Sequence, residues 1–212
     1  MDSEKTNNTE QAILHAAEQE FMEHGHDGAK MMNIARRAGV THAMLHYYFR
    51  TKDNLFDMVV RRKMEALIQN VVTAFTNQDD ELLVDRIIHG MQVHFDFISR
   101  ERDLARFVIS HIMYDEQRCT ELFNFLKQSV KGLTDRLQRE IDEKVAQGEF
   151  QPVRALDLLL DMVSLNVFPF IARPAVELIS QAVEGEDYAA MVASRKQEIA
   201  RVISNRLLRQ PS

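Results

Sequence analysis

The sequence has little of several features that would place it in other classes of protein. It contains one cysteine, Cys119, so no disulfide framework can form within one chain. Its 7 Gly and 4 Pro are too few for a fibrous or disordered protein. No stretch is long and apolar enough to cross a bilayer, and the polar N-terminal residues lack the apolar core of a secretory signal. We therefore expect a soluble cytoplasmic protein.

Motifs that carry chemistry are also missing. The sequence has no glycine-rich phosphate loop, no G-x-S-x-G, no H-E-x-x-H and no C-x-x-C. His42 and His46 have the i, i+4 spacing of two metal ligands on one helix, but no third ligand accompanies them. We predict that the protein is not an enzyme and that it has no metal site and no cofactor.

The net charge of −6 argues at first against nucleic acid as a partner. The distribution of charge reverses this impression. Residues 28–63 hold eight Lys or Arg against Asp53 and Asp57, a net charge of +6, whereas residues 1–27 and 64–212 each carry −6. A phosphate-binding surface depends on local cationic density, so residues 28–63 are compatible with DNA binding, although a charge run is more often a solvated face.

Residues that favour helices are abundant, and apolar residues recur at helical period along nearly the whole chain. No β-alternating run or internal repeat appears. The sequence predicts an all-α fold of about nine or ten helices, with a kink or loop at Pro169 and Pro174. The first helix is expected to begin near Thr9 and to end at Gly25. The later helices are expected over 31–38, 42–48, 52–75, 82–99, 103–113, 116–147, 154–168, 175–183 and 187–208.

Two short helices meet within the stretch "NIARRAGVTHAMLHYYFRTKDNLF", residues 33–56. A small residue, Ala35, stands where the helices would touch, and Gly39 supplies the positive φ that ends the first helix. Val40 and Leu45 are apolar at the positions that pin the pair to a core, and Thr41 caps the second helix. This spacing is typical of a helix-turn-helix, whose second helix enters a major groove, although an ordinary αα-corner shares it.

The residues expected to face outward from the second helix favour DNA over the plain corner. His42, Ala43, His46 and Tyr47 are short or flat groups suited to base edges and phosphates, whereas a helix that only packs would show Lys and Glu. Lys52 follows at the N-terminus of the next helix, where free amides and a cation together favour phosphate.

Residues 12–60 resemble the DNA-binding region of the TetR family of transcriptional regulators. The resemblance is carried by the Ile-Leu-x-Ala-Ala…Phe…Gly opening helix, by Ile-Ala-x-x-Ala-Gly-Val, and by the Leu-x-x-x-Phe-x-x-Lys-x-x-Leu run from Leu45 to Leu55. It implies a homodimer that places two recognition helices in successive major grooves of a palindromic operator. The residues that it aligns with DNA-contacting positions are Lys30, Thr41, His42, Ala43, Met44, His46, Tyr47 and Lys52.

The resemblance also implies two functions for the rest of the chain. The middle helices of the family surround an effector pocket, and the residues we select for it here are Phe95, Phe107, His111, Tyr114 and Phe123. The last two long helices form the family's dimer surface, for which we select Leu158, Met162, Leu165, Met191, Val192 and Ile199. Aromatic residues and Met at helical spacing are more often plain core, and both late helices are also compatible with burial inside one chain.

We therefore predict a DNA-binding domain over 1–52 and an effector-binding and dimerisation domain over 53–212. The leading hypothesis is a ligand-responsive repressor released from its operator by a small, largely apolar effector, with helix 52–75 transmitting the change. A nucleoid or cell-division adaptor with the same DNA-binding head and a protein partner is the alternative. A small-molecule enzyme or carrier is the weakest hypothesis, because no residues for chemistry are evident.

Overall fold

The computed structural model describes residues 2–76 and 82–209, and within these helices the side chains of 2–6, 76, 103, 104, 107, 110 and 111 lie outside the description. All of the regular structure in these ranges is helical, which confirms the predicted all-α fold. The elements are α1 (Asp2–Gly28), α2 (Met31–Ala38), α3 (His42–Phe49), α4 (Lys52–Thr76), α5 (Leu83–Arg100), α6 (Arg102–Phe107), the π-helix η1 (Val108–Met113), α7 (Glu116–Ala146), α8 (Ala155–Ile171), α9 (Arg173–Glu184) and α10 (Tyr188–Leu207).

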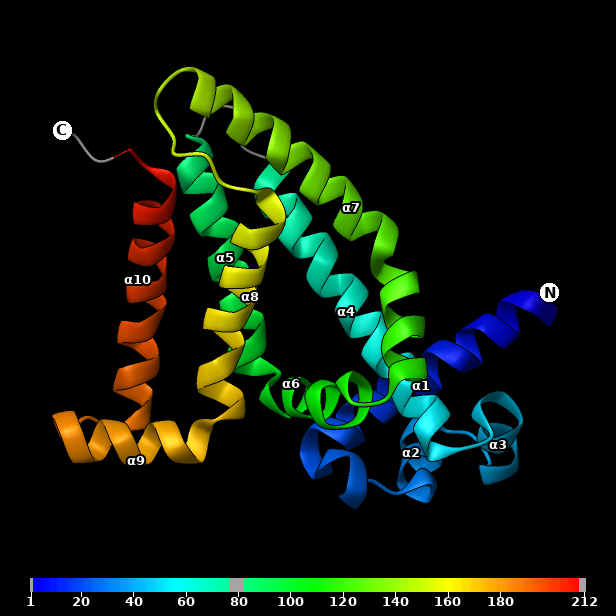
Figure 1. The fold of residues 1–212 in the computed structure, drawn as a ribbon. Helices are drawn as coiled ribbons and strands as arrows, with labels where there is room; N and C mark the ends of the chain where they lie inside the picture. The colour runs from blue at the N-terminus through cyan, green and yellow to red at the C-terminus, as the bar shows by residue number, and fades with distance from the viewer. Residues whose placement is uncertain (1, 77–81, 210–212) are drawn as a thin grey trace.

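The helices form two regions joined by α4 (Figure 1). Helices α2 and α3 lie at one end with α1 and the start of α4, while α5, α8 and α10 pack side by side at the other end. The long helix α7 packs on α4, and α9 crosses the ends of α8 and α10. The pair α2–α3 is therefore far from α10, and α4 contacts both regions.

Two clusters of buried side chains correspond to these regions. The head core joins α1, α2 and α3 to the first half of α4 through Leu55, Phe56, Val59 and Val60, and it includes residues of η1 and α7. The body core joins the end of α4 to α5, α7, α8 and α10. Buried head residues thus continue to Val60, beyond the predicted boundary at residue 52, so that boundary remains a proposal.

Most helix ends follow local sequence signals, and four features differ from expectation. Helix α1 begins at Asp2 and not near Thr9. Gly25 leaves helical geometry at φ 67°, as predicted, but a further turn continues to Gly28. The single helix expected over 103–113 is instead α6 followed by the π-turns of η1. Pro169 lies inside α8, which ends at Ile171, and the chain bends by 82° between α8 and α9.

Candidate nucleic-acid interface

The turn between α2 and α3 has the geometry that its residues predict. Gly39 is left-handed at φ 67° and ψ 26°, and the Val40 N–H donates to the Ala35 carbonyl at 3.0 Å. The Thr41 hydroxyl oxygen accepts a hydrogen bond from the Met44 N–H at 3.2 Å and so caps α3. Because each terminus is closed within three residues, α2 and α3 are held at a fixed angle.

Helix α3 has one buried face and one exposed face. Leu45 and Phe49 are buried in the head core, and Ile34 and Ala35 of α2 are buried beside them. The Tyr47 side chain is 81% exposed. The remaining residues predicted to contact DNA from this helix are also exposed: Thr41, His42, Ala43, Met44 and His46. Their exposure is what contact with a DNA groove requires, while the contacts themselves remain a proposal.

The two predicted lysines differ in their surroundings. Lys30 is exposed at the start of α2. Lys52 is half-buried, and its ammonium donates to the carbonyl oxygens of Asp27 at 3.3 Å and Ala29 at 3.4 Å. Lys52 therefore ties the α1–α2 loop to the start of α4, a structural role that the sequence pattern did not indicate.

A buried carboxylate from α1 fixes α2. Glu20 has no exposed surface, and one of its oxygens accepts from the Lys30 N–H at 3.2 Å and from the Asn33 side chain at 2.9 Å. Its other oxygen lies 3.2 Å from Nε of Arg37. Burial opposes the charged form, but the hydrogen bonds from Asn33 and Lys30 and the nearby charges of His24 and Arg37 hold the pKa of Glu20 below its ordinary value.

The cations of the head fall into two groups. The guanidinium of Arg37 is committed to Glu20 and Glu23. Arg36 and Arg50 are exposed, and no ion pair is found for either within the described part of the chain. Both arginines were absent from our sequence-based set. The signal that could have found them was the +6 charge of residues 28–63, in which they lie beside the predicted contacts.

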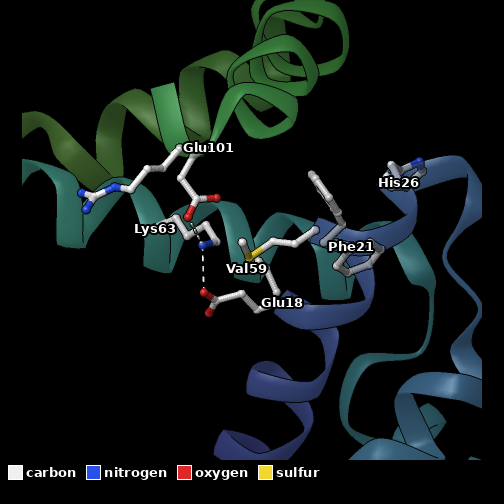
Figure 2. A pocket seen from close by; sticks show the side chains of 10 residues that line it. Glu18, Phe21, His26, Val59, Lys63 and Glu101 are labelled. Carbon is white, nitrogen blue, oxygen red and sulfur yellow. Dashed lines mark hydrogen bonds and ion pairs between the residues drawn. The ribbon is translucent and has the colours of Figure 1, made fainter. Parts of the chain in front are cut away.

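The head is joined to the body by a lysine between two carboxylates (Figure 2). Lys63 of α4 lies 2.8 Å from Glu18 of α1 and 2.9 Å from Glu101, which ends α5. The Lys63 side chain is 11% exposed; burial opposes its charge, yet the bonds to Glu18 and Glu101 raise its pKa. The three residues line a cavity of about 70 Å³ whose apolar wall includes Phe21 and Val59.

A second junction connects α7 to the start of α4. Arg118 lies 3.6 Å from Asp57 and 3.8 Å from Asp53, and Arg61 pairs with Glu121 at 3.1 Å. Burial raises the pKa of Asp57, although Arg118 and Arg61 oppose the rise. A displacement of α7 would therefore act on the same helix that begins next to the α2–α3 pair.

The predicted effector residues are not brought together as expected. Phe95 is buried in the body core, where its ring meets Phe170 edge to face at 5.3 Å between centroids. Tyr114 is 86% exposed and Phe123 is 57% exposed, so these two line no enclosed cavity. The side chains of Phe107 and His111 lie outside the described residues. The sequence correctly assigned these residues to the middle helices. It could not determine which face of each helix packs against the rest of the chain.

The predicted dimer surface requires a correction. Leu158, Met162 and Ile199 belong to the body core and contact other helices of the same chain, while Leu165, Met191 and Val192 are half-buried. The first three therefore cannot provide a contact surface for a second copy. The opposite face of α8 is apolar and exposed instead, through Leu156, Leu160 and Val163, and Val202 of α10 is also exposed.

One histidine of the body is partly buried and hydrogen-bonded to a buried asparagine. His94 Nδ1 lies 3.0 Å from the side-chain nitrogen of Asn166, which also donates to the Met91 carbonyl at 3.0 Å. Because this nitrogen is a donor, His94 Nδ1 is the acceptor. Burial lowers the pKa of His94 to about 4.

Two further features of the described residues concern cation binding and membrane spanning. Glu20, Glu23 and His24 are close enough to hold a cation, but both carboxylates already pair with Arg37. No single helix in the described ranges is long and apolar enough to cross a bilayer, and α8 and α9 pass that test only as a bent pair.

Comparison with known proteins assigns the head. Residues 13–59 match the model of the N-terminal domain described as "Bacterial regulatory proteins, tetR family". This range contains the whole of α2 and α3 with their buried contacts to α1 and α4. Residues 13–59 belong to the tetR family of DNA-binding domains. This membership confirms the resemblance drawn from residues 12–60 and makes the protein a DNA-binding transcriptional regulator, a class that is not enzymatic.

Curated relatives and solved structures match this chain over most of its length. It is 25% identical over 166 residues to the "Probable HTH-type transcriptional regulator YttP" of Bacillus subtilis, covering 77% of each chain. It is 25% identical over 152 residues to the "Nucleoid occlusion factor SlmA" of Vibrio cholerae, covering 71% of this chain and 76% of SlmA. The fold resembles that of the fatty acid degradation regulator FadR of Bacillus halodurans, with a TM-score of 0.59 at 17% identity and coverage of 90% and 97%.

Proposed function

We propose that the protein is a ligand-responsive repressor that binds a palindromic operator as a homodimer and is released by a small, largely apolar effector. The observation that carries this proposal is the exposed face of α3, which presents His42, His46 and Tyr47 in a head whose Lys30, Arg36 and Arg50 are also exposed. Side chains on the exposed face of a recognition helix reach base edges, while the cations contact phosphates. The DNA-binding head then covers 1–52, and 53–212 form the effector-binding and dimerisation region.

The second apolar face of α8 supports a dimer. A helix with apolar residues on both faces is stable when both are covered, and α8 buries one face in the body core while Leu156, Leu160 and Val163 stay exposed. These three residues have the i, i+4, i+7 spacing of one stripe. Packing of α8 and α10 against the same helices of a second copy would form a four-helix interface around a two-fold axis.

The two junctions support a route from effector to DNA. Lys63 and Arg118 link α4 to the α5–α6 corner and to α7, and α4 begins where the recognition helix ends. A change in the body would rotate α4 and with it the separation of the two recognition helices. The apolar character of the effector is favoured by the largely apolar body core and by the fatty acid degradation regulator among the structural relatives.

Binding to labelled duplexes from the region upstream of the protein's own gene tests the DNA-binding proposal. We expect saturable binding that weakens with rising salt, because phosphate contacts release counterions. Tyr47→Ala should weaken binding at least about fivefold, which corresponds to roughly 1 kcal/mol for one lost contact. The matched control is Tyr114→Ala, since Tyr114 is equally exposed but lies outside the head. Equal affinities for both variants and the wild type would contradict the assigned interface.

A panel of effectors tests the regulatory part. Medium- and long-chain fatty acids and their thioesters, aromatic hydrocarbons and sugar phosphates would be added to the protein–DNA complex. We expect release by an apolar compound and none by sugar phosphates. A nucleoid or cell-division adaptor, favoured by the similarity to SlmA, would instead keep its DNA affinity with every compound and retain a protein partner at fixed stoichiometry.

A further inference from the structure

One hydrogen bond determines which ring nitrogen of His46 carries its hydrogen. Nδ1 of His46 lies 2.7 Å from the carbonyl oxygen of Arg50. A carbonyl oxygen only accepts, so Nδ1 must donate and therefore carries the hydrogen. In the neutral ring Nε2 then has a free lone pair and is an acceptor. No partner for Nε2 is found among the described residues.

The turn that follows α3 holds the Arg50 carbonyl in place. Arg50 has φ 55° and ψ −52°, and among the described residues it is the one non-glycine with positive φ. The Thr51 N–H donates to the Phe49 carbonyl at 2.5 Å, which makes Arg50 the centre of a γ-turn of the rare positive-φ type. The Arg50 N–H donates back to the His46 carbonyl at 3.0 Å. The backbone itself thus fixes the acceptor that selects the His46 tautomer.

A neighbouring ring restricts His46 further. The His42 ring lies 4.5 Å from the His46 ring, centroid to centroid, at an interplanar angle of 73°. His46 is therefore held by Arg50 on one side and His42 on another, while the side chain remains exposed on the recognition helix. A ring held in this way presents the same nitrogen before and after DNA arrives, so little orientational freedom is lost on binding.

We propose that His46 is a specificity-determining residue that presents Nε2 as a hydrogen-bond acceptor and so selects a base whose exocyclic amino group lies in the major groove, adenine or cytosine, at one position of each half-site. This inference rests on the proposed function. Adenine N6 and cytosine N4 are the donors that the major groove offers. Guanine and thymine present acceptors at the corresponding edge, so an Nε2 lone pair would face O6, N7 or O4 without a hydrogen between them.

Selection from a pool of randomised DNA duplexes tests the proposal at about pH 8, well above the range in which free imidazole takes up a proton. The wild type should enrich adenine or cytosine at one position per half-site. His46→Ala should reduce that preference about tenfold, the value of one good base contact, and leave the other positions selective. His15→Ala, which removes another exposed histidine of the head, should leave every position unchanged. Selectivity that is unchanged at every position in His46→Ala would overturn the inference.

Two further outcomes are informative. One would show that His46 has only a structural role, and the other would show that the proposed function itself is wrong. If His46→Ala weakens selection at all positions equally, His46 only holds the Arg50 turn and the base-selecting role is wrong. If the wild-type protein enriches no sequence at all, the proposed function is wrong and the base-selecting role of His46 is wrong with it. Nitrogen-15 NMR of the DNA-free protein examines the tautomer independently: a hydrogen on Nδ1 and a bare Nε2 are expected, and a hydrogen on Nε2 in the neutral ring would overturn the inference whatever the selection finds.

Discussion

At the scale of single residues, Glu20 couples the stability of the head to pH. Its carboxylate holds the start of α2 and pairs with Arg37, and its pKa is lowered in the folded state. A lowered pKa means that the unfolded chain binds the proton more tightly, so the contribution of Glu20 is complete above its unfolded pKa and is lost as pH falls through the folded value.

We therefore expect Glu20→Gln to destabilise the protein at neutral pH by about 1.5–3 kcal/mol, the range for hydrogen bonds to charged groups. The difference from the wild type should shrink as the pH falls below about 4.5, where the wild-type carboxylate is protonated as well. Thermal unfolding followed between about pH 7 and pH 3 measures both effects. A difference that stays constant over the whole range would show that the charge of Glu20 contributes nothing.

His94 also has a lowered pKa in the folded state, and it affects stability in a different pH window. Burial lowers its pKa from 6.5 to about 4, so the unfolded chain takes up a proton that the folded chain excludes. Stability should therefore fall as pH drops from 6.5 toward 4. In His94→Gln, whose amide can still accept from Asn166, this part of the acid slope should disappear, while the Glu20-dependent loss at lower pH remains. Unfolding curves for both variants across these two windows distinguish the groups.

Residue exposure in α3 was predictable, whereas the individual hydrogen bonds were not. Thr41 as cap, Gly39 in the left-handed region and the outward positions of His42, His46 and Tyr47 follow from helix-end chemistry and period. The His46 bond to Arg50 depends on the positive φ of an arginine, which no propensity favours. The internal bonds of Lys52 likewise depend on where the α1–α2 loop lies.

At the scale of elements, the contact of α4 with α5 depends on a glycine. A methyl group at Gly90 would lie 2.4 Å from a ring carbon of Phe75, which is itself buried in the body core. Alanine inside a helix is favoured over glycine by about 1 kcal/mol. Overpacking costs about 1–3 kcal/mol, so at this position the steric cost outweighs the gain in helix propensity.

We expect Gly90→Ala to lower the melting temperature and Gly132→Ala to raise it. Gly132 lies in α7, and a methyl group there has no neighbouring atom within 4 Å, so only the gain in propensity of up to about 1 kcal/mol applies. Differential scanning calorimetry of the two variants provides the comparison. Stabilisation by both substitutions would mean that Phe75 moves without cost and that the α4–α5 contact is looser than these distances indicate.

Helix limits were predicted closely where a capping residue or glycine is present and less well where tertiary contacts decide. The limits 31–38 for α2 agree with the prediction because Gly39 ends the helix by its own conformation. Helix α8 runs past Pro169 because Phe170 packs on Phe95 in the body core and holds the last turn. The π-turns of η1 have no sequence signature comparable to a cap.

At the scale of the whole molecule, sequence period located the apolar faces of α8 and α10 but could not assign them to core or partner. Leu158 and Leu160 differ by two positions, which is about 200° around a helix. Leu158 is buried inside the chain and Leu160 is 58% exposed. A residue pattern that is apolar all round therefore predicts that both faces are covered, and only the packed chain distinguishes the intramolecular face from the free one.

This distinction makes the dimer testable with one pair of variants. If α8 packs on its counterpart in a second copy, Leu160→Lys places an ammonium group without a partner in an apolar interface, which costs several kcal/mol and should raise the dissociation constant more than about 100-fold. Sedimentation velocity should then give twice 24.6 kDa for the wild type and 24.6 kDa for the variant. The control is Leu82→Lys, since Leu82 is also an exposed leucine and lies at the start of α5.

Because two recognition helices bound together gain effective concentration, Leu160→Lys should also lose operator affinity while keeping its melting behaviour at low concentration. A monomeric wild type, or equal masses for both variants, would remove the dimer on which operator spacing depends.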